Sequence, residues 1–111
     1  MVLREEINSK MQRFRELCSS HQVRYIYAFG SSVTDRFDEE KSDIDLLVEV
    51  DAEDPVERGE KLMSLWDGLE ALFLRKVDLL TDSSLKNPYL RKSIEATKVL
   101  IYDGSGEKVF I

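Results

Sequence analysis

The segments Phe29-Gly30-Ser31-Ser32 and Asp43-Ile44-Asp45-Leu46-Leu47-Val48 decide the fold of this 111-residue chain. Their pattern predicts a strand that ends in a tight turn, a short linking segment, and a second strand that carries two carboxylates. Side chains alternate between the two faces of a strand, so Asp43 and Asp45 are expected on one face and the alternate apolar residues on the other. Two carboxylates about 7 Å apart on one strand face can reach a shared pair of hard cations.

A phosphate site is predicted at the turn between these two strands. Glycine at position 30 permits a backbone conformation with positive φ and a close approach to a ligand. A Gly-Ser turn before a helix start also offers unpaired backbone N–H groups and the positive end of a helix dipole. The hydroxyl of Ser31 would bind phosphate oxygens, with help from Ser32. Serine is also a favoured helix N-cap that needs no ligand, and the two roles are compatible.

Each carboxylate also has an ordinary structural interpretation. Asp43 can close a loop, and Asp45 can be a solvated residue on an exposed strand face. Aspartate is depleted in strands, so two of them at positions i and i+2 beside an apolar run favour a functional role. Asp78 lies in a third expected strand and completes a metal triad if that strand pairs beside the second one. Its alternative is a carboxylate at a strand edge before a turn, in a region where Asp82 shows that acids are tolerated.

Hydrophobic periodicity predicts a single α/β (α+β) domain, with a mixed sheet of about four strands covered by helices. The apolar stripe of residues 3–20 predicts one amphipathic helix, and Asp54-Pro55 marks the start of a second helix that extends to Phe73. A third helix starts at Asn87-Pro88, with Leu90 and Ile94 facing inward. The expected strands are residues 23–29, 44–50, 76–81 and 99–102. The domain is expected to span residues 1–103, with residues 104–111 as a C-terminal tail or an extra edge strand.

The composition limits the classes of partner. The net charge is −6, from 22 acidic and 16 basic side chains. This charge argues against direct nucleic-acid binding, because a nucleic-acid binder shows a basic face or stripe. It is compatible with a nucleotide substrate, since bound magnesium supplies positive charge locally. Cys18 is the only cysteine, which rules out an internal disulfide. Without an apolar run of about 18 residues or a signal-peptide pattern, no membrane association is expected, and the expected location is the cytoplasm.

The order Gly30-Ser31, Ser42-Asp43-Ile44-Asp45-Leu46 and Val77-Asp78-Leu79 resembles the nucleotidyltransferase superfamily of DNA polymerase beta. Within that superfamily the chain is most similar to the minimal nucleotidyltransferases (MNT). These short stand-alone proteins accompany HEPN-domain proteins in prokaryotic toxin–antitoxin pairs. The resemblance covers residues 1–103, because the order of elements matches as well as the motif. It implies a polymerase-beta-like nucleotidyltransferase fold.

The resemblance also implies an activity. The chain would be a magnesium-dependent nucleotidyltransferase that transfers AMP from ATP to a hydroxyl, plausibly a tyrosine of a HEPN-domain toxin, and so acts as the antitoxin. Because so short a chain has no room for a separate acceptor-binding domain, a partner protein would supply the acceptor surface. The implied catalytic and metal-binding residues, for two Mg²⁺ ions, are Asp43, Asp45 and Asp78, and the implied nucleotide-binding residues are Gly30, Ser31 and Ser32.

The chain departs from the family pattern at two places. The spacer between Ser31 and Asp43 has eleven residues, one more than is usual, which a one-residue loop insertion explains without a change in strand phase. The Arg that is common three residues after the motif Ser is Thr34 in this chain. This second departure concerns the affinity for a triphosphate. It keeps an alternative open, in which the chain is a catalytically weak or inactive antitoxin that neutralises its partner by binding alone.

Overall fold

The computed structural model describes residues 2–33 and 43–110 of the chain. The helices are α1 (Val2–Ser9), α2 (Met11–Ser20), α3 (Pro55–Phe73) and α4 (Pro88–Thr97), with two short 3₁₀ helices, η1 (Gly30–Val33) and η2 (Asp82–Ser84). The strands are β1 (Val23–Phe29), β2 (Ile44–Val50), β3 (Val77–Leu80), β4 (Val99–Asp103) and β5 (Lys108–Val109). Among the described helices, none has the length and apolar character that crossing a bilayer requires.

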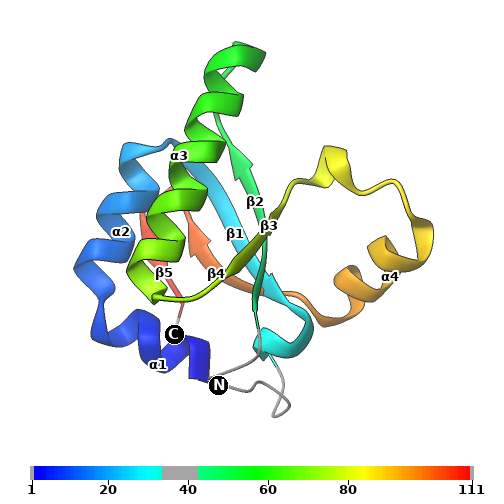
Figure 1. Ribbon diagram of the computed structural model, residues 1–111, viewed down its shortest axis with the longest axis horizontal. Helices are drawn as coiled ribbons and strands as arrows, with labels where there is room; N and C mark the ends of the chain where they lie inside the picture. Colours follow the sequence, from blue (N-terminus) through cyan, green and yellow to red (C-terminus); the bar gives the residue numbers. More distant parts are fainter. Residues whose placement is uncertain (1, 34–42, 111) are drawn as a thin grey trace.

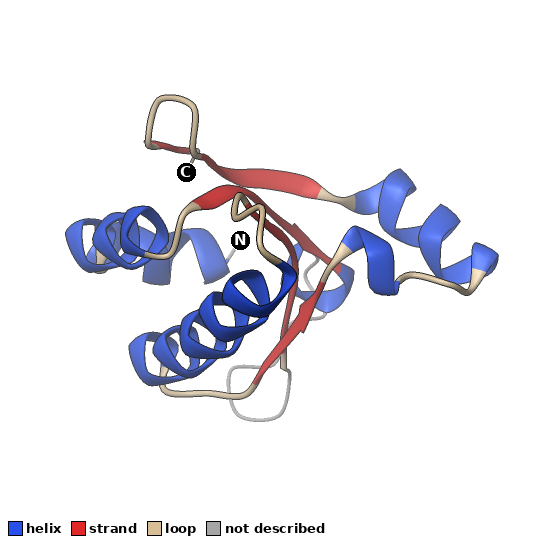
Figure 2. Ribbon diagram, turned by 90° about the horizontal axis from the view of Figure 1, so that it is seen from above, coloured by secondary structure: helices blue, strands red, loops and turns tan. Residues whose placement is uncertain are grey.

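The strands form one mixed sheet in the order β3-β2-β1-β4-β5. β2 and β3 are parallel and joined by the crossover helix α3, whereas the other neighbouring strands are antiparallel. Helices α1, α2 and α3 lie on one face of the sheet, and α4 lies on the other (Figures 1 and 2). The predicted α/β class is confirmed. The sheet has five strands rather than about four, because Lys108 and Val109 pair with the end of β4.

The main core lies between the sheet and helices α1–α3. Phe14 of α2 is fully buried there, with its ring centroid 6.2 Å from that of Phe73 on α3 and 6.2 Å from that of Tyr102 on β4. Leu46 and Val48 of β2 belong to this core, which confirms the predicted alternation along the strand. Each fully buried apolar side chain of this size contributes about 1.5–3 kcal/mol. This core holds β2 in place and leaves its opposite face for other contacts.

The amino-terminal segment contains two helices where periodicity predicts one. Lys10 separates them with a non-helical backbone (φ −125°, ψ 27°), and its Nζ donates to the carbonyl oxygen of Leu72 at 2.7 Å. The apolar stripe continues across this break, since Ile7 before it and Phe14 after it are both buried. Periodicity records which side chains are buried, so it does not detect a change of helix axis that keeps the same face inward.

The predicted start of α3 is confirmed, whereas one prediction for α4 is wrong. The carboxylate of Asp54 accepts the N–H of Val56 at 3.1 Å, and Pro55 occupies the first helical position. In α4, Ile94 is buried but Leu90 is 42% exposed, although both were expected to face inward. Ile94 alone of the residues of α4 is fully buried, so the helix touches the sheet along a narrow line.

Gly104 at the β4–β5 turn packs against the start of β1, and a substitution there tests this contact. Its N–H donates to the carbonyl oxygen of Arg24 at 2.8 Å, and a Cβ at this position would overlap the carbonyl oxygen of Val23. Backbone atoms cannot yield as a side chain can, so we expect Gly104→Ala to lower the free energy of unfolding by about 2 kcal/mol. Urea denaturation would show this as a lower midpoint. Gly106→Ala is the matched control, because nothing lies within 4 Å of its Cβ position. Equal losses in both variants would contradict the prediction.

Candidate active site

Two carboxylates from neighbouring parallel strands lie side by side. β2 and β3 pair with Ile44 opposite Val77 and Asp45 opposite Asp78. Because Leu46 faces the main core, Asp45 and its partner Asp78 lie on the other face of the sheet. The two carboxyl groups share a side-chain hydrogen bond. The third strand thus does pair beside the second, which is the condition under which Asp78 joins the site.

The pKa of Asp45 is raised to about 6. Burial is the largest cause, and the negative charges of Asp78 and then Asp43 add to it. All three effects disfavour the ionised form of Asp45, and two of them come from neighbouring carboxylates. The group is therefore a concentration of negative charge that a proton or a cation would relieve.

Asp43 lies just before β2 and is partly exposed. Its Oδ2 is 3.8 Å from Nζ of Lys76, and both side chains are open to solvent, at 38% and 69% exposed. Such a pair contributes little to stability. The described residues include no group of three or more His, Cys, Asp or Glu side chains already arranged around a metal position. The donor set itself fits a hard divalent cation, because carboxylate oxygens are the ligands that Mg²⁺ prefers, and the carboxylates of Asp43 and Asp78 are close enough to Asp45 for their charges to act on it.

The predicted phosphate turn lies directly against Asp45. Gly30 has a φ of 64°, and a Cβ on it would lie 2.7 Å from Oδ2 of Asp45, so glycine is required by backbone and space together. Ser32 is 1% exposed, and its Oγ accepts the backbone N–H of Asp45 at 2.9 Å. Ser31 is partly exposed between them. The turn is a 3₁₀ helix, and Thr34 lies outside the described residues.

Two side chains of α3 hold the edge strand that carries Asp78. The indole Nε1 of Trp66 donates to the carbonyl oxygen of Val77 at 2.6 Å, and Oε2 of Glu70 accepts the N–H of Val77 at 2.9 Å. Both backbone groups on the open side of this residue are therefore occupied by helix side chains. No local sequence pattern predicts this contact of Trp66, because its partner lies on a later strand.

A second apolar cluster stands beside the carboxylates. It joins Phe29 and Leu47 of the sheet to Leu85 and Ile94 from the α4 side. Phe29 is the residue opposite Asp45 in the β1–β2 ladder. The cluster therefore places α4 next to the candidate site, on the face of the sheet that carries the two paired carboxylates.

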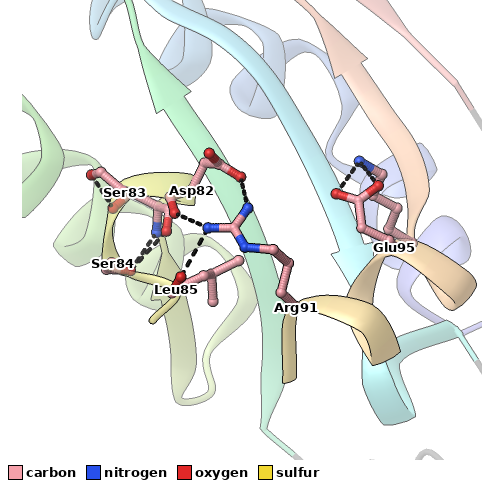
Figure 3. Close-up of polar contacts among 8 residues, drawn as sticks. Asp82, Ser83, Ser84, Leu85, Arg91 and Glu95 are labelled. Carbon is pink, nitrogen blue, oxygen red and sulfur yellow. Dashed lines mark hydrogen bonds and ion pairs between the residues drawn. The ribbon is translucent and has the colours of Figure 1, made fainter. Parts of the chain in front are cut away.

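Arg91 ties α4 to the segment that follows β3. Its guanidinium donates to Oδ1 of Asp82 at 2.8 Å, to the carbonyl oxygen of Asp82 at 3.0 Å and to the carbonyl oxygen of Leu85 at 2.8 Å (Figure 3). We call this group the Arg91 clamp. It separates the two carboxylates that sequence reasoning had to weigh, because Asp82 is engaged by Arg91 while Asp78 lies beside Asp45. Helical spacing alone is typical of a solvated Arg at this position.

The structure brings most of the predicted site residues together. Asp45 contacts Asp78, Gly30 and Ser32, and Asp43 is near enough for its charge to act on Asp45. Their catalytic, metal-binding and nucleotide-binding roles stay predictions. The residues that sequence reasoning missed are those that hold the site in place: Trp66, Glu70 and Arg91.

Comparison with known proteins is consistent with this geometry. Residues 11–101 match the family described as nucleotidyltransferase domain. Two relatives come from Methanocaldococcus jannaschii. "Putative protein adenylyltransferase MJ0126" is 39% identical over 87 residues, which cover 78% of this chain and 85% of the relative. "Putative protein adenylyltransferase MJ1379" is 34% identical over 97 residues, which cover 86% and 95% respectively.

Two solved structures share the fold. The solved structure described as "Structure of putative minimal nucleotidyltransferase" is 24% identical with a TM-score of 0.59, and the match covers 86% of this chain and 92% of that one. A crystal structure of a toxin–antitoxin with AMP-PNP is 22% identical with a TM-score of 0.54, covering 86% and 76%. At this level of identity the likeness concerns the fold alone. The family match over residues 11–101 and the two relatives above 30% identity show that the chain belongs to the nucleotidyltransferase domain family, as the resemblance to minimal nucleotidyltransferases predicts.

Proposed function

We propose that this chain transfers AMP from ATP to a hydroxyl in a magnesium-dependent reaction, and that the acceptor is a tyrosine of a HEPN-domain protein. The observation that carries the proposal is the in-register pairing of Asp45 with Asp78 beside the Gly30 turn. In this family the attacking hydroxyl oxygen forms a bond to the α-phosphorus while the bond to pyrophosphate breaks. The site therefore needs a group of carboxylates and a phosphate-binding turn at one place.

The three carboxylates have distinct parts in this proposal. Asp43, Asp45 and Asp78 would hold the magnesium, which when bound polarises phosphoryl oxygens and neutralises developing charge. Asp78 would also accept the proton of the attacking hydroxyl, as a carboxylate within hydrogen-bonding reach can. The in-register pairing of Asp45 with Asp78 supports this arrangement, since it puts both groups on one face of the sheet.

The turn would bind the triphosphate. The absence of a side chain on Gly30 lets backbone approach within contact distance of Asp45, so phosphate and carboxylate positions are adjacent. Ser31 would contact phosphate oxygens. Ser32 adds a second role to the predicted one, because its Oγ accepts the N–H of Asp45 and so ties the turn to β2. The bound nucleotide would thus be held in a fixed position relative to the carboxylates.

The choice of partner is supported by the resemblance to minimal nucleotidyltransferases. The solved toxin–antitoxin that shares this fold was crystallised with AMP-PNP, an ATP analogue, which supports ATP as the donor. The described structure is one domain without a second lobe to bind an acceptor. We therefore propose that a HEPN-domain protein supplies the acceptor tyrosine.

Nucleotide binding is tested first by thermal unfolding with each of four nucleoside triphosphates and magnesium. ATP at about 100 times its dissociation constant should add roughly 2.7 kcal/mol to the stability, which appears as a raised melting temperature. We expect Asp43→Asn/Asp45→Asn to abolish this shift. Asp67→Asn, which removes an exposed carboxylate of α3, is the matched control and should keep it. A shift that survives in the double variant would place the nucleotide elsewhere.

The transferred group is tested with the HEPN-domain partner and ATP labelled on either the α- or the γ-phosphate. AMP transfer puts only the α-label on the partner and releases pyrophosphate. Label should disappear when the acceptor tyrosine of the partner is changed to Phe and when Asp43 and Asp45 are changed to Asn. Transfer of the γ-label would show a kinase instead. Neutralisation of the partner without any label, equally by the wild type and the double variant, would establish the binding-only alternative.

The raised pKa of Asp45 predicts a pH-dependent stability in metal-free buffer. Because the pKa of Asp45 is higher in the folded protein than its ordinary value of 3.8, the protein loses stability as the pH rises from about 3.8 to about 6. Asp45→Asn removes this loss, so the variant should gain stability relative to wild type across that interval and then level off. Solvent screening at this half-buried site limits the gain to the order of 1 kcal/mol, or about 4 °C in melting temperature. A difference that does not vary with pH would contradict the prediction.

A further inference from the structure

The outer face of α4 is unpartnered in the described structure. Ile94 is its buried contact, while Tyr89 is 84% exposed and Leu90 is 42% exposed. Lys92 and Ala96 are exposed too, at the i+3 and i+7 spacing from Tyr89 that places them on the same side of a helix. We call Tyr89, Leu90, Lys92 and Ala96 the α4 face. An exposed tyrosine and leucine next to each other are typical of an interface rather than of a solvated helix.

The charge of this segment is opposite to that of the chain. Residues 86–98 contain four basic residues and one acidic residue, whereas the whole chain has a net charge of −6. Arg91 is paired with Asp82, and Lys98 is paired with Glu95. Lys86 and Lys92 form no ion pair with any residue that the structure describes. The apolar centre formed by Tyr89 and Leu90 is therefore flanked by two lysines whose charge is not compensated within the described protein.

The α4 face is held rigid before any partner binds. Oδ1 of Asn87 accepts the N–H of Tyr89 at 2.9 Å and the N–H of Leu90 at 3.4 Å, which caps the helix where these two residues lie. One turn later, the Arg91 clamp ties the helix to Asp82 and Leu85. A surface that is already ordered loses little conformational entropy on binding, which favours a role in recognition.

The α4 face also stands at a suitable distance from the candidate site. Ile94 packs on Phe29 and Leu47, beside Asp45, and the helix contacts η1. Tyr89 lies eight residues before Thr97, which is about 12 Å along the helix axis. An interface of ordinary size, about 800 Å² per partner, covers such a span. A protein bound to the α4 face therefore lies on the side of the sheet that carries the carboxylates (Figure 1).

We propose that the α4 face, with Lys86, is the docking surface for the acceptor protein, and that the partner contributes an apolar patch bordered by acidic side chains. This inference rests on the proposed function, because it names where the acceptor binds. A protein fits better than a nucleic acid, since the centre of the surface is apolar and the protein around it is acidic. Phosphate contacts would need more than two uncompensated lysines.

The test measures affinity separately from catalysis. A HEPN-domain protein, the proposed acceptor, is titrated calorimetrically into Asp43→Asn/Asp45→Asn, which prevents turnover. In this background, Tyr89→Ala/Leu90→Ala should raise the dissociation constant roughly tenfold or more. Lys86→Glu/Lys92→Glu should raise it too and make it less dependent on salt.

The matched control is Val56→Ala/Met63→Ala, which removes apolar side chains of α3 that are 68% and 58% exposed. The control should change the affinity less than about twofold.

Further measurements separate the possible occupants and the two proposals. If the control weakens partner binding and the α4 variants do not, or if neither does, docking on α4 is wrong. A change in the chain's own oligomeric state by light scattering, with partner affinity intact, would assign the face to a second copy. Loss of binding to a single-stranded RNA oligonucleotide alone would assign it to nucleic acid.

The α4 variants are also made without the Asp43 and Asp45 substitutions, so that labelling of the partner can be measured. In these variants the loss of labelling should come from a raised KM for the partner, and the ATP-induced rise in melting temperature should be unchanged. Partner binding that needs α4 without any AMP transfer would uphold docking and refute the proposed activity.

Discussion

The parallel register of β2 and β3 is the constraint on which the candidate site depends. It sets Asp45 opposite Asp78, and a slip of one residue would turn Asp78 toward the apolar core. Parallel strands cannot be joined by a short turn, so the chain uses the crossover helix α3 between them. That helix begins at the Asp54 cap and ends beside β3, where Trp66 and Glu70 bind both backbone groups of Val77. The connection therefore also positions the site.

The same register places like charges close together, and the rest of the fold must offset the free-energy cost of their repulsion. Burial raises the pKa of Asp45, and the negative charges of Asp78 and Asp43 raise it further. No fold would keep such a group without stabilising contacts elsewhere, because burial of like charges costs free energy. The apolar residues of β2 that face α1, α2 and α3 provide this stabilisation, since Ile44, Leu46 and Val48 are fully buried. The proposed magnesium would relieve the repulsion between these carboxylates, which would favour its binding.

The two faces of the sheet have different tasks. The face covered by α1, α2 and α3 holds the main core around Phe14 and gives the domain its stability. The other face carries the carboxylates and a small cluster under α4, which the Arg91 clamp and Asn87 keep in place. A helix attached by so few buried side chains leaves most of its own surface available. This division leaves one face of the sheet to stabilise the domain and the other face for the candidate site and the proposed docking surface.

The sequence by itself determined the carboxylates, the turn and the order of elements. Asp43 and Asp45 are two residues apart and Gly30 and Ser31 are adjacent. Strand alternation and glycine conformation are local properties, so the arrangement within each pair can be read from spacing. The cap at Asp54-Pro55 was also predictable because its hydrogen bond spans two residues. The tertiary structure decided the rest. The break at Lys10, the exposure of Leu90, and the contacts of Trp66, Glu70 and Arg91 all depend on partners that are distant or on how a helix meets the sheet. The sequence left residues 104–111 open as a tail or an extra edge strand, and pairing with β4 decided for a strand at Lys108 and Val109. Local patterns report which residues are buried; long-range packing alone chooses their partners, because its free energy comes from contacts that exist only once the chain has folded.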